Sequence, residues 1–493
     1  MTLDPRTPVL VGVGQHSERD GGREPIDLLT EAARSAAADA GSAALLREID
    51  AVRIVRLLSW RYRDPGALLA ERLGAQPRLT GYTGNGGNTP QTLVNTAAAE
   101  IAAGKLDVVL VGGAESWRTR SKLRAQGIRP DWTEQDESVP KAPLVVPEVP
   151  MSAESERRIG LDRPAYIYPL FEQALRLAAG SSIAEHADRI GALWSRFSAV
   201  AAANPHAWTR REYRPAEITT ATPDNRWVSA PYIKLMNSNN MVDQAAALLV
   251  CSVEVAQRHG IPRDRWIFPH AGAEAHDTYA VAERGALHRS PAIRIAGARA
   301  LELAEVGLDE IAHVDVYSCF PSAVQVAAAE LGLPIDDPAR PLTVTGGLTF
   351  AGGPWNNYST HAIATMAETL RRDPGARGLI TANGGYLTKH AFGVYSTEPP
   401  AHGFRHEDVQ ALVDAEPATI ALDSYQGTAE LESWTVVYDR DGKPETAFVA
   451  ARTPSGERTL ARSTEPTTLS CLATEDAAGK AVAVDADGGC VLI

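Results

Sequence analysis

The sequence contains few cysteines and no long apolar stretch. Only four cysteines occur in 493 residues, and their spacing matches neither a zinc-binding pattern nor a small disulfide framework. We therefore expect no metal site and a reducing, cytoplasmic environment. No run of about 18 apolar residues is present, which excludes a membrane-spanning helix. The first residues, MTLDPRTPVLVGVG, have no basic stretch followed by an apolar one, so we expect no signal peptide.

The sequence also lacks an excess of basic residues. Its 48 lysines and arginines are outnumbered by 61 aspartates and glutamates, which gives a formal net charge of −13. Sequence-independent binding to nucleic acid requires clustered basic side chains that neutralise phosphates. Because the acidic residues are dispersed, the charge favours solubility. We expect no nucleic-acid partner.

Apolar strand patterns alternate with helical patterns along most of the chain. PVLVGVG at 8–14, IDAVRIVRLL at 49–58 and DVVLVGG at 107–113 are continuous apolar runs. A helical pattern follows the first run, and another precedes the third at 90–104. Buried strands that alternate with helices are typical of a parallel-rich sheet covered by helices on both faces. The predicted fold class is therefore α/β.

The same pattern recurs in the second part of the chain. Residues 292–320 predict a strand, a helix and a second strand. The pieces IDAV at 49–52 and IAHV at 311–314 hold matching places in the two parts, as do VGG at 111–113 and NGG at 383–385. Weak internal similarity at a long period predicts a duplicated α/β fold rather than a solenoid.

Composition divides the chain into four predicted units. Residues 118–220 are rich in Arg, Trp, Pro and Tyr, which predicts a helical insertion of the kind that builds binding sites. From residue 405 the sequence is rich in Thr, Val, Ser and turn residues, which predicts short antiparallel strands of a small barrel or sandwich. The predicted units are 1–117 with 221–262, 118–220, 263–404 and 405–493.

Together these features resemble the thiolase superfamily, whose members make or cleave carbon–carbon bonds in acyl-CoA thioesters. Residues 8–400 are most similar to its sterol-carrier branch, and the added C-terminal segment resembles the type-1 thiolase-like proteins of actinobacteria. The resemblance implies two duplicated βαβαβαββ halves that form five layers, a helical insertion and a small C-terminal all-β domain, for which an OB-like topology is one option. It also implies that CoA or an acyl-CoA is the ligand, with no other cofactor.

Three of the four thiolase motifs have lost their reactive side chain here. In the family a nucleophilic Cys opens the buried helix, whose N-terminus stabilises a thiolate; the matching position is Gly87, between Gly86 and Asn88. The His of Gly-His-Pro is replaced by Gly353, and the acid/base Cys of Cys-x-Gly by Ala382. We therefore expect ordinary thiolase turnover to be lost. We also expect Gly86 and Gly87 to leave open space where the sulfur would stand.

The remaining catalytic candidates lie near the other motifs. The second motif, His-Asp-Cys-Phe in the sterol-carrier branch, is Tyr-Ser-Cys-Phe at 317–320. It keeps Cys319, which is either a relocated nucleophile or a small buried residue at a strand end. His390, in TKHAFGVYS, is either a replacement acid/base or a structural histidine. Asn383, which follows the lost Cys of the fourth motif, completes the candidates.

The candidates for binding CoA come from a polar loop and from glycines. Residues 236–249, MNSNNMVDQAAALL, resemble the loop that contacts pantetheine in thiolases. Asn237 and Asn239 match its Asn and Ser, and an Asn239 amide suits the pantetheine amides. The alternative is a polar loop that packs on itself. Backbone N–H groups of Gly352 and Gly384 are candidates for binding a thioester oxygen.

Three functions follow from this resemblance. The first is a thiolase-like CoA- or acyl-CoA-binding protein of lipid metabolism without acetyl-CoA C-acyltransferase activity. The second is an acyltransferase or C–C lyase that uses a rebuilt site with Cys319 and His390. The third is a pseudo-enzyme that binds a protein partner through residues 405–493. Monomer and homodimer both stay open, and no membrane partner is expected.

Overall fold

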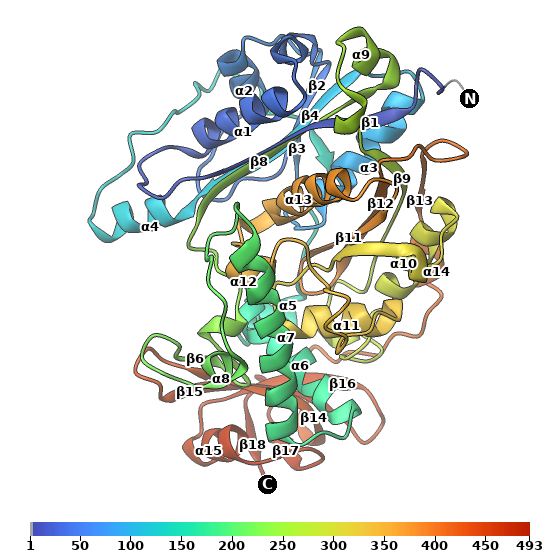
Figure 1. Cartoon of the computed structure of the whole chain (residues 1–493). Coiled ribbons are helices and arrows are strands. Elements are labelled where there is room, and N and C mark those ends of the chain that lie inside the picture. The colour runs from blue at the N-terminus through green and yellow to red at the C-terminus, as the bar shows by residue number, and fades with distance from the viewer. Residues whose placement is uncertain (1–2) are drawn as a thin grey trace.

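The computed structural model describes residues 3–493, which form three β-sheets (Figure 1). The first sheet has the strand order β1-β8-β4-β2-β3-β5. Within it β2 runs parallel to β3 and β4, whereas β8 runs antiparallel to β4 and β1. Its strands are β1 (Pro8–Ser17), β2 (Ala51–Ile54), β3 (Leu79–Thr83), β4 (Val108–Ser116), β5 (Leu144–Val146) and β8 (Asp243–Ser252).

The second sheet repeats the pairing of the first, which confirms the predicted duplication. Its order is β10-β11-β12-β9-β13. β10 and β11 are parallel, and β12 is antiparallel to both β11 and β9. In the first sheet β2 and β4 are likewise parallel, and β8 is antiparallel to both β4 and β1. Its strands are β9 (Phe268–His276), β10 (Ile311–Asp315), β11 (Arg377–Gly384), β12 (Lys389–Ser396) and β13 (Arg405–Asp408).

Helices and the two sheets form five layers, as predicted (Figure 1). The central helices α3 and α13 contact both sheets. One outer layer covers the first sheet and the other covers the second. The central helices are α3 (Thr89–Ala102) and α13 (Tyr358–Arg372), and the outer ones are α1 (Pro25–Asp39), α2 (Pro65–Leu73), α9 (Val253–Arg258), α10 (Pro291–Ala304) and α11 (Pro321–Leu331).

Glycines in the second sheet let helix α3 approach it closely. A Cβ atom at Gly272 of β9 would lie 2.4 Å from Asn95 Oδ1, and one at Gly393 of β12 would lie 2.3 Å from Gln91 Nε2. Both helix residues are buried, and Gln91 Nε2 donates to Asn95 Oδ1 at 2.8 Å. The start of α3 is therefore fixed against the second sheet, and this fixes the loop that precedes it.

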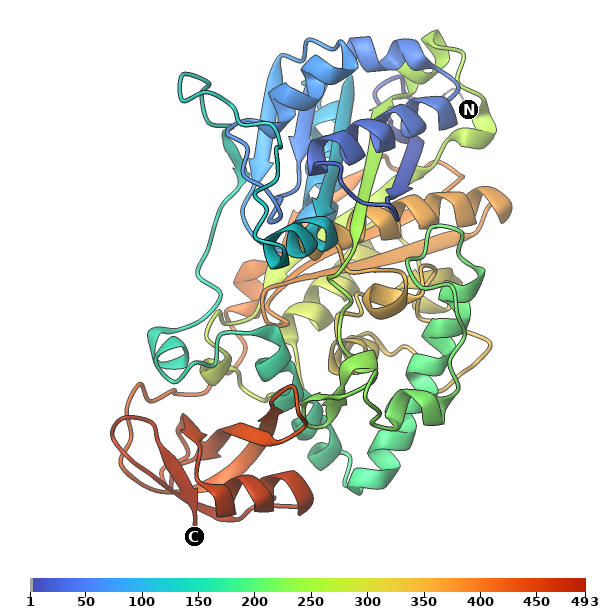
Figure 2. The ribbon, with the colours of Figure 1, turned by 90° about the vertical axis from the view of Figure 1, so that its left-hand side faces the viewer.

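The insertion is mainly helical, as predicted, and it also supplies strand β5 to the first sheet. Helix α6 contacts both α11 of the second half and the C-terminal strands, whereas α7 contacts α11 and lies to the side of those strands (Figure 2). Helix α7 begins with a capping box in which Ser182 and Glu185 bond each other's backbone N–H. The helices are α4 (Trp117–Ala125), α5 (Glu154–Arg158), α6 (Pro164–Ala178), α7 (Ile183–Ala203) and α8 (Pro215–Thr219), and the short α12 (Gly347–Phe350) packs on α7.

The C-terminal strands form a small closed sheet at the end of the molecule opposite the first sheet (Figures 1 and 2). Their order is β16-β15-β14-β17-β18, and a parallel bridge between Arg462 and Gly489 joins the two ends. Five strands closed in this order, with a helix between the third and the fourth, have the OB-like topology that the sequence permits. The elements are β14 (Gly427–Tyr438), β15 (Pro444–Arg452), β16 (Arg458–Ser463), α15 (Pro466–Thr474), β17 (Ala481–Val484) and β18 (Cys490–Leu492).

Some element boundaries differ from those predicted. The predicted strand at the start of 292–320 is helix α10, because Ser290 caps it through Ile293 N and Pro291 suits its first turn. β6 (Trp227–Ser229) and β7 (Tyr232–Ile233) lie in the segment assigned to the first half, but β6 pairs with β14 of the C-terminal sheet. β13 and the short α14 (Gln410–Val413) belong to the second half although they follow residue 404.

The C-terminal barrel is attached to the rest of the chain by buried contacts. The Arg458 side chain is fully buried and binds both carboxylate oxygens of Glu432 at 2.7 Å. It also donates to the backbone oxygens of Ala282 and Arg284 in the second half. Ser433 Oγ donates to Leu170 O of helix α6 at 2.6 Å. Helix α6 thus packs against the barrel along its length.

Candidate functional site

A cavity of about 570 Å³ opens where the start of α3, the end of β11 and the loop after β10 meet. The first residues of α6 and the loop before β8 complete its wall. Its volume is in the range of small-molecule sites. Half of the predicted site residues line it: Gly87, Asn237, Cys319, Asn383 and Gly384.

The other predicted residues are not among those that line the cavity, and their predicted roles stay predictions. Gly352 packs on Gln244, whose Oε1 would lie 2.1 Å from an added Cβ. Gly353 N donates to Asn239 O at 2.9 Å, and Asn239 Oδ1 accepts from the backbone of its own loop at Met241. Ala382 is buried within strand β11, and His390 lies in β12 behind the cavity wall.

The side-chain position of Gly87 is already occupied. A Cβ atom there would lie 2.3 Å from Tyr317 Oη and 2.5 Å from the backbone oxygen of Asn383. The expectation of open space at Gly87 is therefore wrong, because the Tyr317 side chain and the Asn383 carbonyl fill that space. At Gly86 an added Cβ would lie 2.3 Å from Asn88 Oδ1. No nucleophile fits on this loop as it stands.

Cys319 lies in the cavity wall as a buried thiol. Its Sγ accepts a weak contact from Asn383 Nδ2 at 3.9 Å, and its backbone oxygen accepts from Ser238 Oγ at 2.8 Å. Burial raises the pKa of the thiol to about 12. Burial also raises the pKa values of Tyr317 and Tyr168 above their ordinary value. At neutral pH these three groups are protonated, so they offer hydrogen bonds but no anionic nucleophile.

We expect Cys319 to resist alkylation. Because only the thiolate reacts and its pKa is raised to about 12, Cys319 should react with iodoacetamide at pH 8 at least about 100-fold more slowly than Cys471, which is partly exposed. Peptide mapping by mass spectrometry over a time course measures both rates in one sample. Equal rates would mean that Cys319 is an activated thiol.

Tyr168 is a cavity residue that the sequence did not single out. Its Oη accepts from Asn383 Nδ2 at 3.0 Å and from Leu387 N at 2.9 Å, and it donates to Gly385 O at 3.3 Å. Its ring stacks on Phe320, with 4.5 Å between ring centroids. It therefore joins helix α6 to the loop after β11. Only its place in the aromatic RPAYIYPLF stretch could have pointed to it.

Trp355 forms part of the cavity mouth. It adopts a left-handed backbone conformation, with φ of 48°, which is rare for a bulky residue. Its indole packs on Trp117, with 4.9 Å between ring centroids. Its Nε1 is buried without a hydrogen-bond partner and is the kind of donor that a ligand carbonyl would satisfy. Strained residues of this kind concentrate at binding sites.

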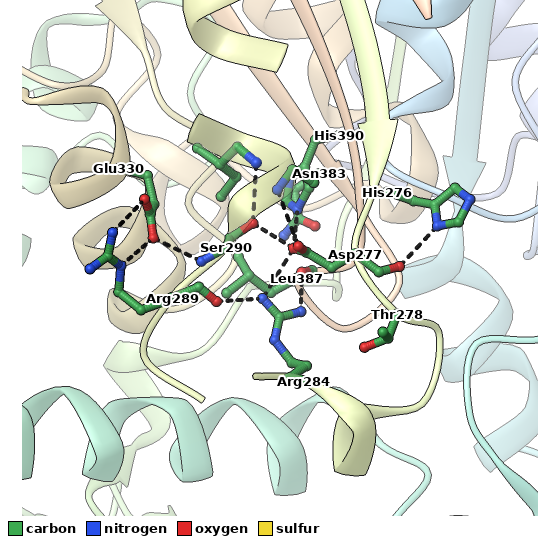
Figure 3. Close-up of polar contacts among 12 residues, drawn as sticks. His276, Asp277, Thr278, Arg284, Arg289, Ser290, Glu330, Asn383, Leu387 and His390 are labelled. Atoms are coloured by element: carbon green, nitrogen blue, oxygen red, sulfur yellow. Dashed lines mark hydrogen bonds and ion pairs between the residues drawn. The ribbon is translucent and has the colours of Figure 1, made fainter. Parts of the chain in front are cut away.

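His390 belongs to a buried polar cluster behind the cavity wall (Figure 3). Its Nε2 lies 3.7 Å from Asp277 Oδ2. The same carboxylate accepts from Ser290 Oγ at 2.5 Å and from Arg284 Nη2 at 3.1 Å. Burial acts to raise the pKa of Asp277, but the Arg284 charge and these hydrogen bonds outweigh it and hold the pKa at about 2. Asp277 is therefore ionised at neutral pH.

The structure places no metal ligands together. In residues 3–493 no group of three or more His, Cys, Asp or Glu side chains is arranged to hold a metal ion. No helix in the described part of the chain is long and apolar enough to cross a membrane. The side chains that line the cavity supply amides, hydroxyls, one thiol and, at Asp162 and Arg163, one carboxylate and one guanidinium.

Residues 408–489 match the family described as "thiolase-like protein type 1 additional C-terminal domain". The crystal structure of a monomeric SCP2-thiolase-like protein type 1 from Mycobacterium smegmatis is 34% identical, with a TM-score of 0.85 and complete coverage of both chains. An Ltp2–ChsH2(DUF35) aldolase is 19% identical, with a TM-score of 0.61, and covers 79% of this chain and 98% of that one; at this identity the likeness concerns the fold alone.

An acetyl-CoA acetyltransferase of Methanocaldococcus jannaschii is 23% identical over 266 residues, 54% of this chain and 60% of that enzyme. The chain thus spans less than two thirds of this curated relative. The duplicated five-layer fold and the Gly-rich loop before its central helix define a thiolase-fold protein. More narrowly, the chain belongs to the SCP2-thiolase-like proteins of type 1.

Proposed function

We propose that this protein binds CoA or an acyl-CoA of lipid metabolism in the 570 Å³ cavity without forming an acyl-enzyme. One observation carries the proposal: Tyr317 Oη and the Asn383 backbone oxygen fill the space in which a side chain at position 87 would stand. The covalent route needs a nucleophile at that place. Its loss removes thiolase turnover but leaves the cavity.

The cavity wall suits a thioester. Asn237 and Asn383 place side-chain amides in or beside it, and Gly384 and Gly385 place backbone amides there. Amides pair well with the amides of pantetheine, and protonated Cys319 offers a further weak donor. Acetyl-CoA acetyltransferases among the relatives support CoA thioesters as the ligand class.

We expect calorimetric titration to detect binding of CoA and of at least one acyl-CoA. Ala165→Trp, at the start of α6 in the cavity wall, should weaken binding by at least about tenfold because the indole fills the cavity. Ala178→Trp, at the exposed end of the same helix, should stay within about twofold. A wild-type protein that binds no CoA and no acyl-CoA would overturn the proposal.

The alternative is an acyltransferase or C–C lyase that uses Cys319 and His390. The position of Cys319 in the cavity wall favours it, whereas burial, which raises the pKa of that thiol to about 12, opposes it. Cleavage of acetoacetyl-CoA by the wild type that is lost in Cys319→Ala would establish this alternative. If Cys319→Ala keeps the activity of the wild type, Cys319 does not take part in the reaction.

We also propose that the protein is monomeric and that it has the four predicted units, with 227–233 moved to the C-terminal unit and 405–413 moved to the second half. Strand β5 covers the outer edge of β3, so this edge is closed to a second copy. The M. smegmatis relative is described as monomeric.

All four cysteines are unpaired, which fits a cytoplasmic protein. The aldolase neighbour is described by two protein names, Ltp2 and ChsH2(DUF35), which supports the proposal that residues 405–493 of this chain bind a protein partner.

A further inference from the structure

A small void lies behind the cavity wall, between one face of the β11–β12 ladder and helices α10 and α11. Its volume is about 10 Å³, and four polar residues, Tyr317, Thr381, Asn383 and His390, line it beside the apolar Ile293, Ala323, Ala327, Leu387 and Phe392. A space of this size holds about one water molecule, provided that two to four polar groups surround it. Asn383 lines both this void and the large cavity, so its side chain is part of the wall between them.

Asn383 and His390 are directly opposite each other in the antiparallel ladder. Directly opposite residues point to the same face of a sheet, with Cβ atoms about 5 Å apart. Each has a buried polar atom without a hydrogen-bond partner, Asn383 Oδ1 and His390 Nε2. Buried polar groups in folded proteins are almost always hydrogen-bonded, so we expect these two atoms to share a hydrogen-bonding group in the void.

The same imidazole nitrogen, Nε2, also lies near a fixed charge. Asp277 Oδ2 lies 3.7 Å from His390 Nε2, and Arg284, Ser290 and Ala292 N hold the carboxylate in place (Figure 3). The amide nitrogen of Asn383 is held in place, because Nδ2 contacts Tyr168 Oη at 3.0 Å and Cys319 Sγ at 3.9 Å. Neither His390 Nε2 nor Asn383 Oδ1 has a hydrogen-bond partner among residues 3–493.

We propose that one water molecule occupies this void and joins the Asp277–His390 pair to the Asn383 amide, so that His390 positions the polar wall of the thioester cavity. His390 is thus a positioning residue, since it lies outside the cavity and acts through Asn383. The water holds the Asn383 side-chain amide in the orientation in which Nδ2 points toward Tyr168 and Cys319. The role in ligand binding rests on the proposed function, whereas the water site itself does not.

The first test is a crystal structure of the wild-type protein at a resolution of about 1.2 Å, at which ordered waters and amide orientations are well defined. We expect one full-occupancy water within hydrogen-bond distance of His390 and Asn383. An empty void, or a direct bond between the two side chains, would overturn the proposal. This outcome is independent of whether CoA binds.

The second test compares acetyl-CoA with CoA by titration in three variants. His390→Leu should weaken acetyl-CoA binding about tenfold and leave CoA within about twofold, because the thioester meets the Asn383 wall. His390→Gln, which can still bond a water, should recover most of the loss. His361→Leu removes another buried histidine, bonded to Gln15 outside the cavity, and should change neither affinity.

Equal binding of acetyl-CoA by folded His390→Leu and wild type would contradict the positioning role. A His361→Leu variant with the same selective loss would contradict it too, since the effect would then follow from general loosening of the core. If His390→Leu does not fold, His390→Gln and the crystallographic water still decide the question. A wild type that binds neither ligand defeats the proposed function and the positioning role, but not the water site.

Discussion

Gly87→Ala destabilises the protein by about 1–3 kcal/mol, the range for a side chain forced into a filled core. The added methyl collides with Tyr317 Oη and with the backbone oxygen of Asn383, at 2.3 and 2.5 Å. The backbone contact is the more serious, because a carbonyl in β11 cannot rotate away as a side chain can. Thermal unfolding followed by circular dichroism measures the loss as a lower midpoint.

The matched control is Gly353→Ala, which should change stability by less than about 1 kcal/mol. A Cβ atom at Gly353 would meet its nearest neighbours at 3.4–3.5 Å, which is ordinary contact. The two variants compare a position whose side-chain space is filled with one whose space is free, and the sequence predicts the loss of a reactive side chain at both. Equal midpoints for the two variants would show that Tyr317 does not occupy the Gly87 side-chain space.

A second consequence concerns attempts to restore the nucleophile. Gly87→Cys should give no acetyl-CoA acetyltransferase activity, because its sulfur has no place beside Tyr317. Gly87→Cys combined with Tyr317→Ala removes the Oη contact but keeps the Asn383 carbonyl contact. We therefore expect the double variant to be still inactive and no more stable than the single variant, because truncation of the buried Tyr317 ring leaves a cavity.

Replacing Arg458 with methionine should destabilise the protein by about 3–5 kcal/mol, the usual effect of removing one partner of a buried ion pair. Arg458 is fully buried and binds Glu432 through two hydrogen bonds of 2.7 Å. Its loss also leaves the backbone oxygens of Ala282 and Arg284 without this donor. Hydrogen exchange should rise first in residues 281–284, where the barrel meets the second half.

Arg452→Met is the matched control, because Arg452 binds the same Glu432 at 2.8 Å from a partly exposed position. Exposed ion pairs contribute about 0–1 kcal/mol. The two variants remove the same charge next to the same carboxylate and differ mainly in burial. If both lower the unfolding midpoint equally, the burial of Arg458 does not hold the barrel in place.

The fold could be predicted from the sequence because its signals are local and repeated. Continuous apolar runs at 8–14 and 107–113 became β1 and β4, whereas the double glycines lie inside β4 at 112–113 and at the end of β11 at 384–385. Strand pairing within each half follows from this duplication. Residues 227–233 escaped prediction, because their partner β14 lies about 200 residues later in the chain.

The site was less predictable, because its shape depends on packing between distant segments. The sequence predicts that Gly87 stands in place of a nucleophile, but it does not predict that Tyr317 fills the side-chain space there. Tyr168 reaches the cavity from the insertion, for which no motif exists. His390 faces a void behind the wall rather than the cavity, and a spacing of seven residues from Asn383 could not distinguish these sides.

The central claim is that an acyl-CoA binds here without acylating the protein. The most direct measurement is the intact mass of the protein after incubation with excess acetyl-CoA and rapid acid quench, beside a thiolase that has its nucleophilic Cys. We predict an unchanged mass under conditions in which titration shows the cavity to be occupied, while the control thiolase gains an acetyl group. A stoichiometric acetyl adduct, whether on Cys319 or on another residue, would contradict the claim.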